Sequence, residues 1–244
     1  MANYRRVLLV IALVGLSAGC LGFLTGSQAL EFSANRTVAS DAALDATGYQ
    51  EADNQTVTNV VRVGTAGQER RVNLTSYLYV YNRSVDANDL NESQLAALGG
   101  ETGVGAPGQG TEPPDGIGNA TVPVGNARSP VTFSVLAMPN ARVGGQSVHP
   151  LSRVSPERLV RRFLETGDAS VRFVGNRTVD SLGGERTVST FRVENQGTAA
   201  DVVVHVAAFD AGNDYVIAFG THPGLVDERD RVDTLIAGLE QPFV

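Results

Sequence analysis

Residues 71–82 constrain the fold more than any other stretch, because apolar and polar side chains alternate along them. A period of two is typical of a β-strand with one face against a core, whereas a helix repeats every 3.6 residues. The chain is therefore expected to contain a β-sheet. We expect a second layer to cover the tyrosine face with the hydroxyl groups at its rim, and the alternative is an aromatic binding surface. The apolar face contains Val72, Leu74, Leu78 and Val80, and the other face contains Asn73, Thr75, Tyr77, Tyr79 and Tyr81.

Further strands are predicted on both sides of this one. Residues 56–63 are rich in β-branched side chains, and the turn at residues 64–67 joins them to residues 71–82 as an antiparallel hairpin. Two nearly continuous apolar runs within residues 201–221 are typical of central strands that are covered on both faces. The other predicted strands are residues 131–138, 141–143, 170–180, 185–194, 201–209 and 215–221, with hairpin turns at 181–184 and 210–214.

Four helices are predicted from their capping residues and apolar spacing. The clearest begins at Ser155, where a capping serine is followed by Pro156 at the first helical position and by Glu157 in the first turn. The last helix has apolar residues at i, i+3, i+4 and i+7 and acids at its start. The predicted helices are residues 41–46 with Ser40 as N-cap, 89–98, 155–166 and 227–240.

These elements predict an α+β fold, in which helices 155–166 and 227–240 pack on an antiparallel β-sheet. We expect residues 30–244 to form a single domain, and two smaller lobes are the alternative. Residues 99–125 contain nine glycines and four prolines and have almost nothing to bury. They are therefore predicted to be a disordered insert.

The N-terminal residues have the composition of an export signal. Arg5 and Arg6 precede an uncharged apolar run, residues 7–16, and small residues at positions 17–19 precede Cys20. Cys20 is the only cysteine in 244 residues, so it has no disulfide partner and no second thiolate with which to share a metal. A lone cysteine after small residues resembles a lipobox, in which the thiol receives a lipid and becomes the mature N-terminus.

We therefore predict that residues 1–19 are the export signal and that residues 20–29 tether the folded part, through a lipid on Cys20, to the extracellular face of the cell membrane. The arginine pair also resembles a twin-arginine signal. The alternative anchor is a retained helix over residues 7–24, an uncharged stretch at the short end of what spans a bilayer. In both cases the arginines stay inside and the rest of the chain lies outside.

The charged residues argue against one class of partner. All 19 basic residues are arginine, and 26 acidic residues give a formal net charge of −7. An acidic, lysine-free chain with small apolar residues is typical of extreme halophiles, because dense carboxylates keep a surface hydrated at high salt. No basic patch is present to neutralise phosphates, so nucleic acid is not an expected partner.

Asn-X-Ser/Thr triplets occur seven times, and each could accept a glycan on an exported protein. Asn73 lies within a predicted strand and is set aside. The remaining candidates for N-glycosylation are Asn35, Asn54, Asn82, Asn91, Asn119 and Asn176.

No motif of catalysis or metal binding is found. His149, His205 and His222 are the only histidines, and none has another ligand at the spacing of a zinc site. His205 lies among valines and is interpreted as a satisfied core or rim histidine. The sequence contains neither a G-x-S-x-G elbow nor a phosphate-binding glycine loop. We therefore predict no catalytic residue, no metal and no cofactor.

Several short motifs stand out as a group: residues 31–34, 41–44 with 47–49, 133–135 with 138–139, 144–146 with 149–150, and 214–218 with Pro223. Together they resemble an uncharacterised family of haloarchaeal membrane lipoproteins. The resemblance covers roughly residues 16–82 and 131–240, leaves out the insert, and implies no established activity. More distantly, the order of helices and strands is similar to the PsbP/Mog1 layout, which implies an α+β fold and no function.

A binding or interaction module at the cell surface is the function that the sequence favours, because the chain has an export signal and an anchor but no catalytic motif. One alternative is a carrier of an apolar ligand, which needs a dry pocket of some hundreds of Å³ between the sheet and its helices. The other is an enzyme, which needs a cleft where histidine and carboxylate side chains converge with shifted pKa values.

Overall fold

The computed structural model describes most of the chain after residue 28. Several predictions lie outside the described residues: Arg5, Arg6, Cys20, the alternative helix at residues 7–24, the helix at 89–98, the insert at 99–125, Asn91 and Asn119. The described residues are 29–63, 70–85, 131–143, 146–147, 151, 154–164, 169–194 and 201–242.

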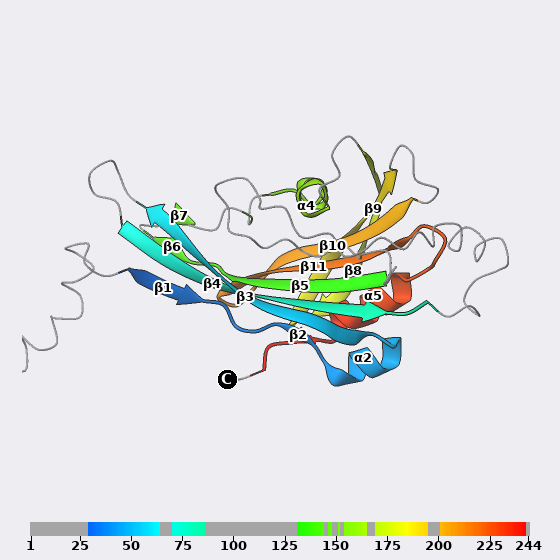
Figure 1. The fold of residues 1–244 in the computed structure, drawn as a ribbon, viewed down its shortest axis with the longest axis horizontal. Coiled ribbons are helices and arrows are strands. Elements are labelled where there is room, and N and C mark those ends of the chain that lie inside the picture. The colour runs from blue at the N-terminus through cyan, green and yellow to red at the C-terminus, as the bar shows by residue number, and fades with distance from the viewer. Residues whose placement is uncertain are drawn as a thin grey trace, which may run out of the picture.

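One eight-stranded sheet forms the body of the molecule (Figure 1). Its strands follow the order β1-β4-β5-β11-β10-β9-β8, and β3 pairs with the other edge of β4. Two small sheets pair β12 with β2 and β6 with β7. The strands of the large sheet are β1 (Leu30–Ser33), β3 (Gln50–Val63), β4 (Arg70–Arg83), β5 (Val131–Pro139), β8 (Ser170–Ser181), β9 (Gly184–Glu194), β10 (Val202–Ala211) and β11 (Asp214–Pro223), and the small sheets contain β2 (Val38–Ala39), β6 (Arg142–Val143), β7 (Gln146–Ser147) and β12 (Leu239–Glu240).

The sheet is mixed, so the prediction of a purely antiparallel sheet is wrong at one pair. Strand β1 runs parallel to β4, whereas the other pairs of the large sheet are antiparallel. The lengths of the strands explain the exception. Strand β5 pairs only with residues 77–83 of β4, and β1 pairs with residues 72–75 on the same edge, where β5 no longer reaches. The prediction of a sheet with packed helices is otherwise confirmed.

The predicted hairpins are confirmed, and their turns explain the register. Between β8 and β9, Leu182 and Gly183 both have positive φ values, of 47° and 74°, as a tight two-residue turn requires. Between β10 and β11, Gly212 has a φ of 61°. The strand expected at residues 56–63 begins earlier, at Gln50, because β4 is long enough to pair with it over its whole length.

Three helices cover the two faces of the sheet. Helix α4 (Pro156–Phe163) packs on one face, and α2 (Asp41–Thr47) and α5 (Arg229–Ala237) pack on the other (Figure 1). The predicted caps are confirmed, since the hydroxyls of Ser40 and Ser155 accept backbone N–H groups of the first turns. Helix α5 is shorter than its prediction of 227–240, because residues 239–240 leave the helix and pair with β2.

Tyr81 shows what covers the tyrosine face. Its ring is buried in the same core as α2 and α5, and its hydroxyl accepts the backbone N–H of Ala39 at 3.1 Å. Burial raises the pKa of Tyr81 to about 12. The predicted covering layer is therefore confirmed at this residue, but its hydroxyl lies inside the layer and not at the rim.

Helix α5 approaches the sheet very closely. A Cβ atom on Gly220 of β11 would lie 2.7 Å from the Val232 side chain, so only glycine allows this contact. At the start of the helix the fully buried carboxylate of Glu228 contacts Arg83, Arg231 and the hydroxyl of Tyr49. This cluster of opposite charges fixes the start of α5 against the end of β4.

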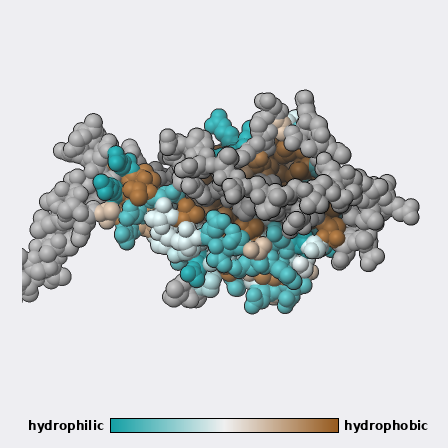
Figure 2. Space-filling view, in the orientation of Figure 1, coloured by the Kyte–Doolittle hydropathy of each residue, from teal (hydrophilic) through white to brown (hydrophobic). Residues whose placement is uncertain are grey.

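The side chains exposed on β3 are mostly polar. Figure 2 shows hydrophilic residues over the described surface around α2 and β3. Among the described helices, none combines the length and the hydropathy that crossing a membrane requires.

A substitution at Gly220 tests the close contact of α5. Gly220→Ala is expected to lower the free energy of unfolding by roughly 1–3 kcal/mol, because the added methyl group overlaps Val232. Gly175→Ala is the matched control, since a Cβ there meets no atom within 4 Å. Denaturant unfolding of both variants measures the effect. Equal stability of the two variants would contradict the packing described for α5.

Candidate functional site

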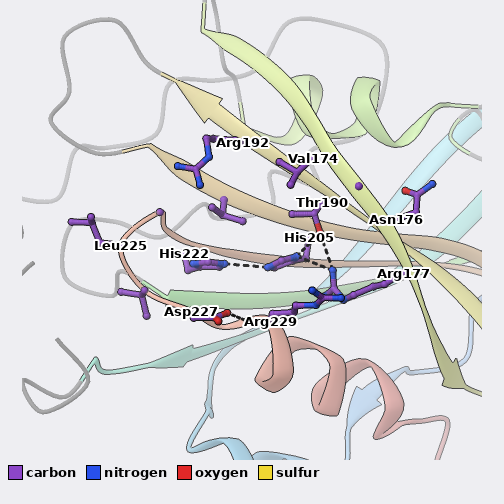
Figure 3. A pocket seen from close by; sticks show the side chains of 14 residues that line it. Val174, Asn176, Arg177, Thr190, Arg192, His205, His222, Leu225, Asp227 and Arg229 are labelled. Atoms are coloured by element: carbon purple, nitrogen blue, oxygen red, sulfur yellow. Dashed lines mark hydrogen bonds between the residues drawn. The ribbon is translucent and has the colours of Figure 1, made fainter. Parts of the chain in front are cut away.

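A cleft of about 480 Å³ opens beside the start of α5 (Figure 3). Strands β8, β9, β10 and β11 supply its floor and one wall, and the segment from Gly224 to Arg229 supplies the other wall. Eight of its fourteen lining residues are polar or charged, and the apolar ones are Val174, Val203, Leu225 and Val226. The residues that carry the chemistry are Arg177, Thr190, Arg192, His205, His222, Asp227 and Arg229.

Two buried histidines meet on the floor of the cleft. His205 lies on β10 and His222 on β11, and their Nε2 atoms are 3.1 Å apart. The ring planes differ by only 21° and the ring centres are 5.2 Å apart, so the rings meet edge to edge. The prediction that His205 is a satisfied histidine is confirmed, although its main partner is a second histidine.

The partners at both ends determine where the protons of this pair lie. His222 Nδ1 is 2.9 Å from the Pro223 carbonyl oxygen, which can only accept, so Nδ1 carries the hydrogen and Nε2 accepts. His205 Nε2 must then donate to His222 Nε2, which leaves His205 Nδ1 as an acceptor. Both rings are therefore neutral, each in a different tautomer.

Arg177 of β8 completes the chain of hydrogen bonds. Its Nη1 donates to His205 Nδ1 at 3.1 Å and to Thr190 Oγ1 at 2.8 Å, and the Thr190 hydroxyl donates to the same Nδ1 at 3.0 Å. Its Nε lies within 2.8 Å of both carboxylate oxygens of Asp233 on α5. An uninterrupted chain thus runs from Asp233 through Arg177 and the two histidines to the Pro223 carbonyl. Figure 3 shows its middle part, from Arg177 through His205 to His222.

The surroundings keep both histidines uncharged. Burial lowers the pKa of His205 to about 3, and the charges of Arg177 and Arg229 act in the same direction. Burial also lowers the pKa of His222, against the opposing effects of the Pro223 carbonyl, Glu228 and Asp227. A second proton on either ring would place two donors face to face.

Two arginines lie at the mouth of the cleft. Arg192 of β9 pairs with Asp201 at 3.0 Å, and both side chains are about a third exposed, at 34% and 39%. Arg229 is exposed on the first turn of α5, where its backbone N–H donates to Asp227. These two guanidinium groups remain accessible to solvent, whereas that of Arg177 is buried.

The side chains of the cleft floor are better suited to a fixed binding surface than to catalysis. Thr190 and His205 are hydrogen-bonded like a nucleophile and its base. However, a histidine with a pKa near 3 is a very weak base at neutral pH, and both of its nitrogens already have partners. Within the described residues, no three histidine, cysteine or acidic side chains are grouped as metal ligands.

The predicted glycosylation candidates lie in different environments. Asn54 is exposed on β3, and Asn176 is exposed at the edge of the cleft. Asn35 donates its amide to the buried Asp214 at 2.8 Å, and Asn82 is half-buried within the sheet. None of these four residues is brought into contact with the histidine pair. Cys20, Arg5, Arg6, Asn91 and Asn119 lie outside the described residues.

The contact between His205 and His222 was not predicted, although the register of the hairpin between β10 and β11 could have indicated it. The turn pairs Ala211 with Asp214, and counting outward from it pairs His205 with Gly220 and Val203 with His222. Two residues that are two positions apart on paired strands lie on the same face of the sheet. The histidines are adjacent in the fold although they are 17 positions apart in the chain.

The family of the chain follows from one comparison. Residues 36–240 match the model of a domain of unknown function, DUF6517. The chain belongs to this family. The DUF6517 segment includes the whole cleft lining, from Val174 to Arg229, while Cys20 precedes it. A search among curated proteins finds no match to the chain.

Stability should depend on pH through the histidine pair. An unfolded histidine binds a proton below its ordinary pKa of about 6.5, whereas buried His205 does not until about pH 3. Above about pH 6.5, His205 therefore does not lower the free energy of unfolding. Below that pH the unfolded chain binds a proton that the folded chain does not, so the free energy of unfolding falls. Between pH 7 and 5 we expect His205 to remove on the order of 1–2 kcal/mol from the free energy of unfolding.

His205→Gln provides the comparison, because a glutamine amide also offers one donor and one acceptor and does not titrate. Its free energy of unfolding, measured by denaturant at pH 7 and pH 5, should fall less than that of the wild-type chain. An equal fall in both proteins would show that His205 is not held neutral.

Proposed function

We propose that this chain is an exported, membrane-anchored lipoprotein, and that its DUF6517 domain is a binding module with the cleft as its ligand site. One observation carries the second half of the proposal. Two neutral histidines and three arginines converge on a single open hollow, and the side chains of its floor are locked by one chain of hydrogen bonds.

A rigid floor is what a binding site needs. When side chains are already held in place, a ligand does not have to order them, and more of the contact energy appears as affinity. His205, His222 and Arg177 each have partners on neighbouring elements. The volume of about 480 Å³ is within the range of small-molecule sites.

The lining of the cleft argues against both alternatives. A carrier of an apolar ligand needs a continuous apolar lining, whereas in this cleft the apolar side chains of Val174, Val203, Leu225 and Val226 stand among arginines, histidines and an acid. The described core residues on both faces of the sheet pack against the helices that cover them. An enzyme needs a base of suitable strength, and the low pKa of His205 makes it a poor one.

The N-terminal sequence supports the anchor. Arg5 and Arg6, the apolar run and the small residues before Cys20 form an export signal with a lipid-accepting cysteine. Residues 20–29 would then span from the membrane to the first strand, β1. The acidic, lysine-free composition supports an extracellular location in a salt-rich medium, and so does the resemblance of the short motifs to haloarchaeal lipoproteins.

Cys20→Ser tests the lipid anchor. The variant should accumulate as a heavier, unprocessed precursor, because neither the lipid nor the new N-terminus can form. Mass spectrometry of the membrane fraction measures both changes. If the variant has the mass of the wild-type protein and stays in the membrane, a retained helix over residues 7–24 is the anchor.

Filling the cleft tests the ligand site. Val203 is half-buried in the cleft lining, so Val203→Trp should occupy the hollow. In a thermal-shift screen of anionic, cationic and neutral small molecules, compounds that raise the Tm of the wild-type chain should leave this variant unchanged. Thr178→Trp, at an exposed position of β8 outside the lining, is the control and should respond like wild type. An equal response of both variants would place binding elsewhere.

A further inference from the structure

We propose that the cleft binds the oxyanion of a small ligand, a carboxylate or a phosphate group, between the guanidinium groups of Arg192 and Arg229. This inference rests on the proposed function, because it names the ligand class of the same site.

Arginines outnumber acids among the residues that line the cleft, whereas acids outnumber arginines in the whole chain. The protein contains 26 acidic residues against 19 arginines, yet the cleft is lined by three arginines and a single acid, Asp227. Asp233 neutralises Arg177 on the buried floor, and Asp201 faces Arg192 at the mouth. With Asp227, the cleft thus has three arginines against three acids, so an anion entering this hollow meets a nearly neutral lining on a chain whose net charge is −7.

The ion pair between Arg192 and Asp201 at the mouth of the cleft can be replaced by a ligand. Arg192 and Asp201 are joined by one contact of 3.0 Å, and both side chains remain in contact with water. Solvent-exposed pairs of this type contribute little to stability, so a ligand carboxylate or phosphate can replace Asp201 at little cost. The Arg177 pair differs, because its guanidinium is buried and faces both oxygens of Asp233. Arg177 therefore shapes the site, and Arg192 is available to a ligand.

Arg229 supplies the second cation from the opposite wall. It is exposed on the first turn of α5, and its charge reaches the floor strongly enough to lower the pKa of His205. The helix begins at the cleft, so its dipole adds positive potential in the same direction. Two arginine forks on facing walls suit the several oxygens of a carboxylate or phosphate group.

Isothermal titration of the full-length protein with inorganic phosphate and with citrate tests the proposal at low and high salt. We expect at least one probe to bind, and to bind more weakly as salt rises. Arg192→Gln and Arg229→Gln should each weaken binding about tenfold, the effect of losing one charge-assisted hydrogen bond. Arg162→Gln, on the exposed side of α4 across the sheet, is the matched control and should bind like wild type.

Asp201→Asn gives a change in the opposite direction. It frees Arg192 from its partner, so each probe that binds the wild-type chain should bind this variant several-fold more tightly. Failure of both probes to bind, or equal losses in the Arg162 and Arg229 variants, would overturn the oxyanion site. If a neutral compound stabilises the wild-type chain but not Val203→Trp while phosphate and citrate fail, the cleft remains a binding site and the ligand class is wrong. Binding by phosphate alone or by citrate alone identifies which group the site takes.

Discussion

Helix α5 is held on the sheet by charge at two points, and the second of them shapes the cleft. At its start, the buried Glu228 carboxylate binds Arg83 of β4, which is 145 positions earlier in the chain. One turn later, Asp233 binds Arg177 of β8. Breaking one partner of a buried ion pair typically costs about 3–5 kcal/mol, because a charge is left without a partner. These two pairs connect strands near the two sides of the sheet to one short helix.

The cleft follows from the second pair. Asp233 orients the guanidinium of Arg177, which donates to His205, and His205 in turn donates to His222. The last hydrogen bond of this chain ends on the Pro223 carbonyl, directly before the segment that forms the far wall. Helix α5, the cleft floor and the far wall are thus parts of one hydrogen-bonded unit. A substitution in any of them should therefore change the geometry of the ligand site.

Local sequence patterns predicted the strands and turns well, because they depend on neighbouring residues. The alternation at residues 71–82, the glycines of the two hairpins and the serine caps each act within a few positions. The parallel pair of β1 and β4 could not be predicted, since β1 is four residues long and carries no pattern that fixes its partner.

The candidate site also has one part that the sequence could predict and one part that it could not. The histidine pair could be found by counting from the turn at Gly212, because hairpin register is local. The partners of Arg177 and Arg83 could not, because they depend on how α5 is rotated and placed on the sheet. Glu228 illustrates the difference. The sequence placed it among acids that favour the start of a helix, and in the fold it is the buried partner of a distant arginine.

The protonation of the two histidines tests the hydrogen-bonded unit most directly. Nitrogen chemical shifts and couplings in an NMR experiment distinguish the two neutral tautomers from the charged ring. At pH 7.5, His205 should carry its hydrogen on Nε2 and His222 on Nδ1. His205 should stay neutral at pH 5.5, below the ordinary histidine pKa of about 6.5. A charged His205 ring at pH 5.5, or a hydrogen on its Nδ1 at pH 7.5, would contradict the chain from Asp233 to Pro223.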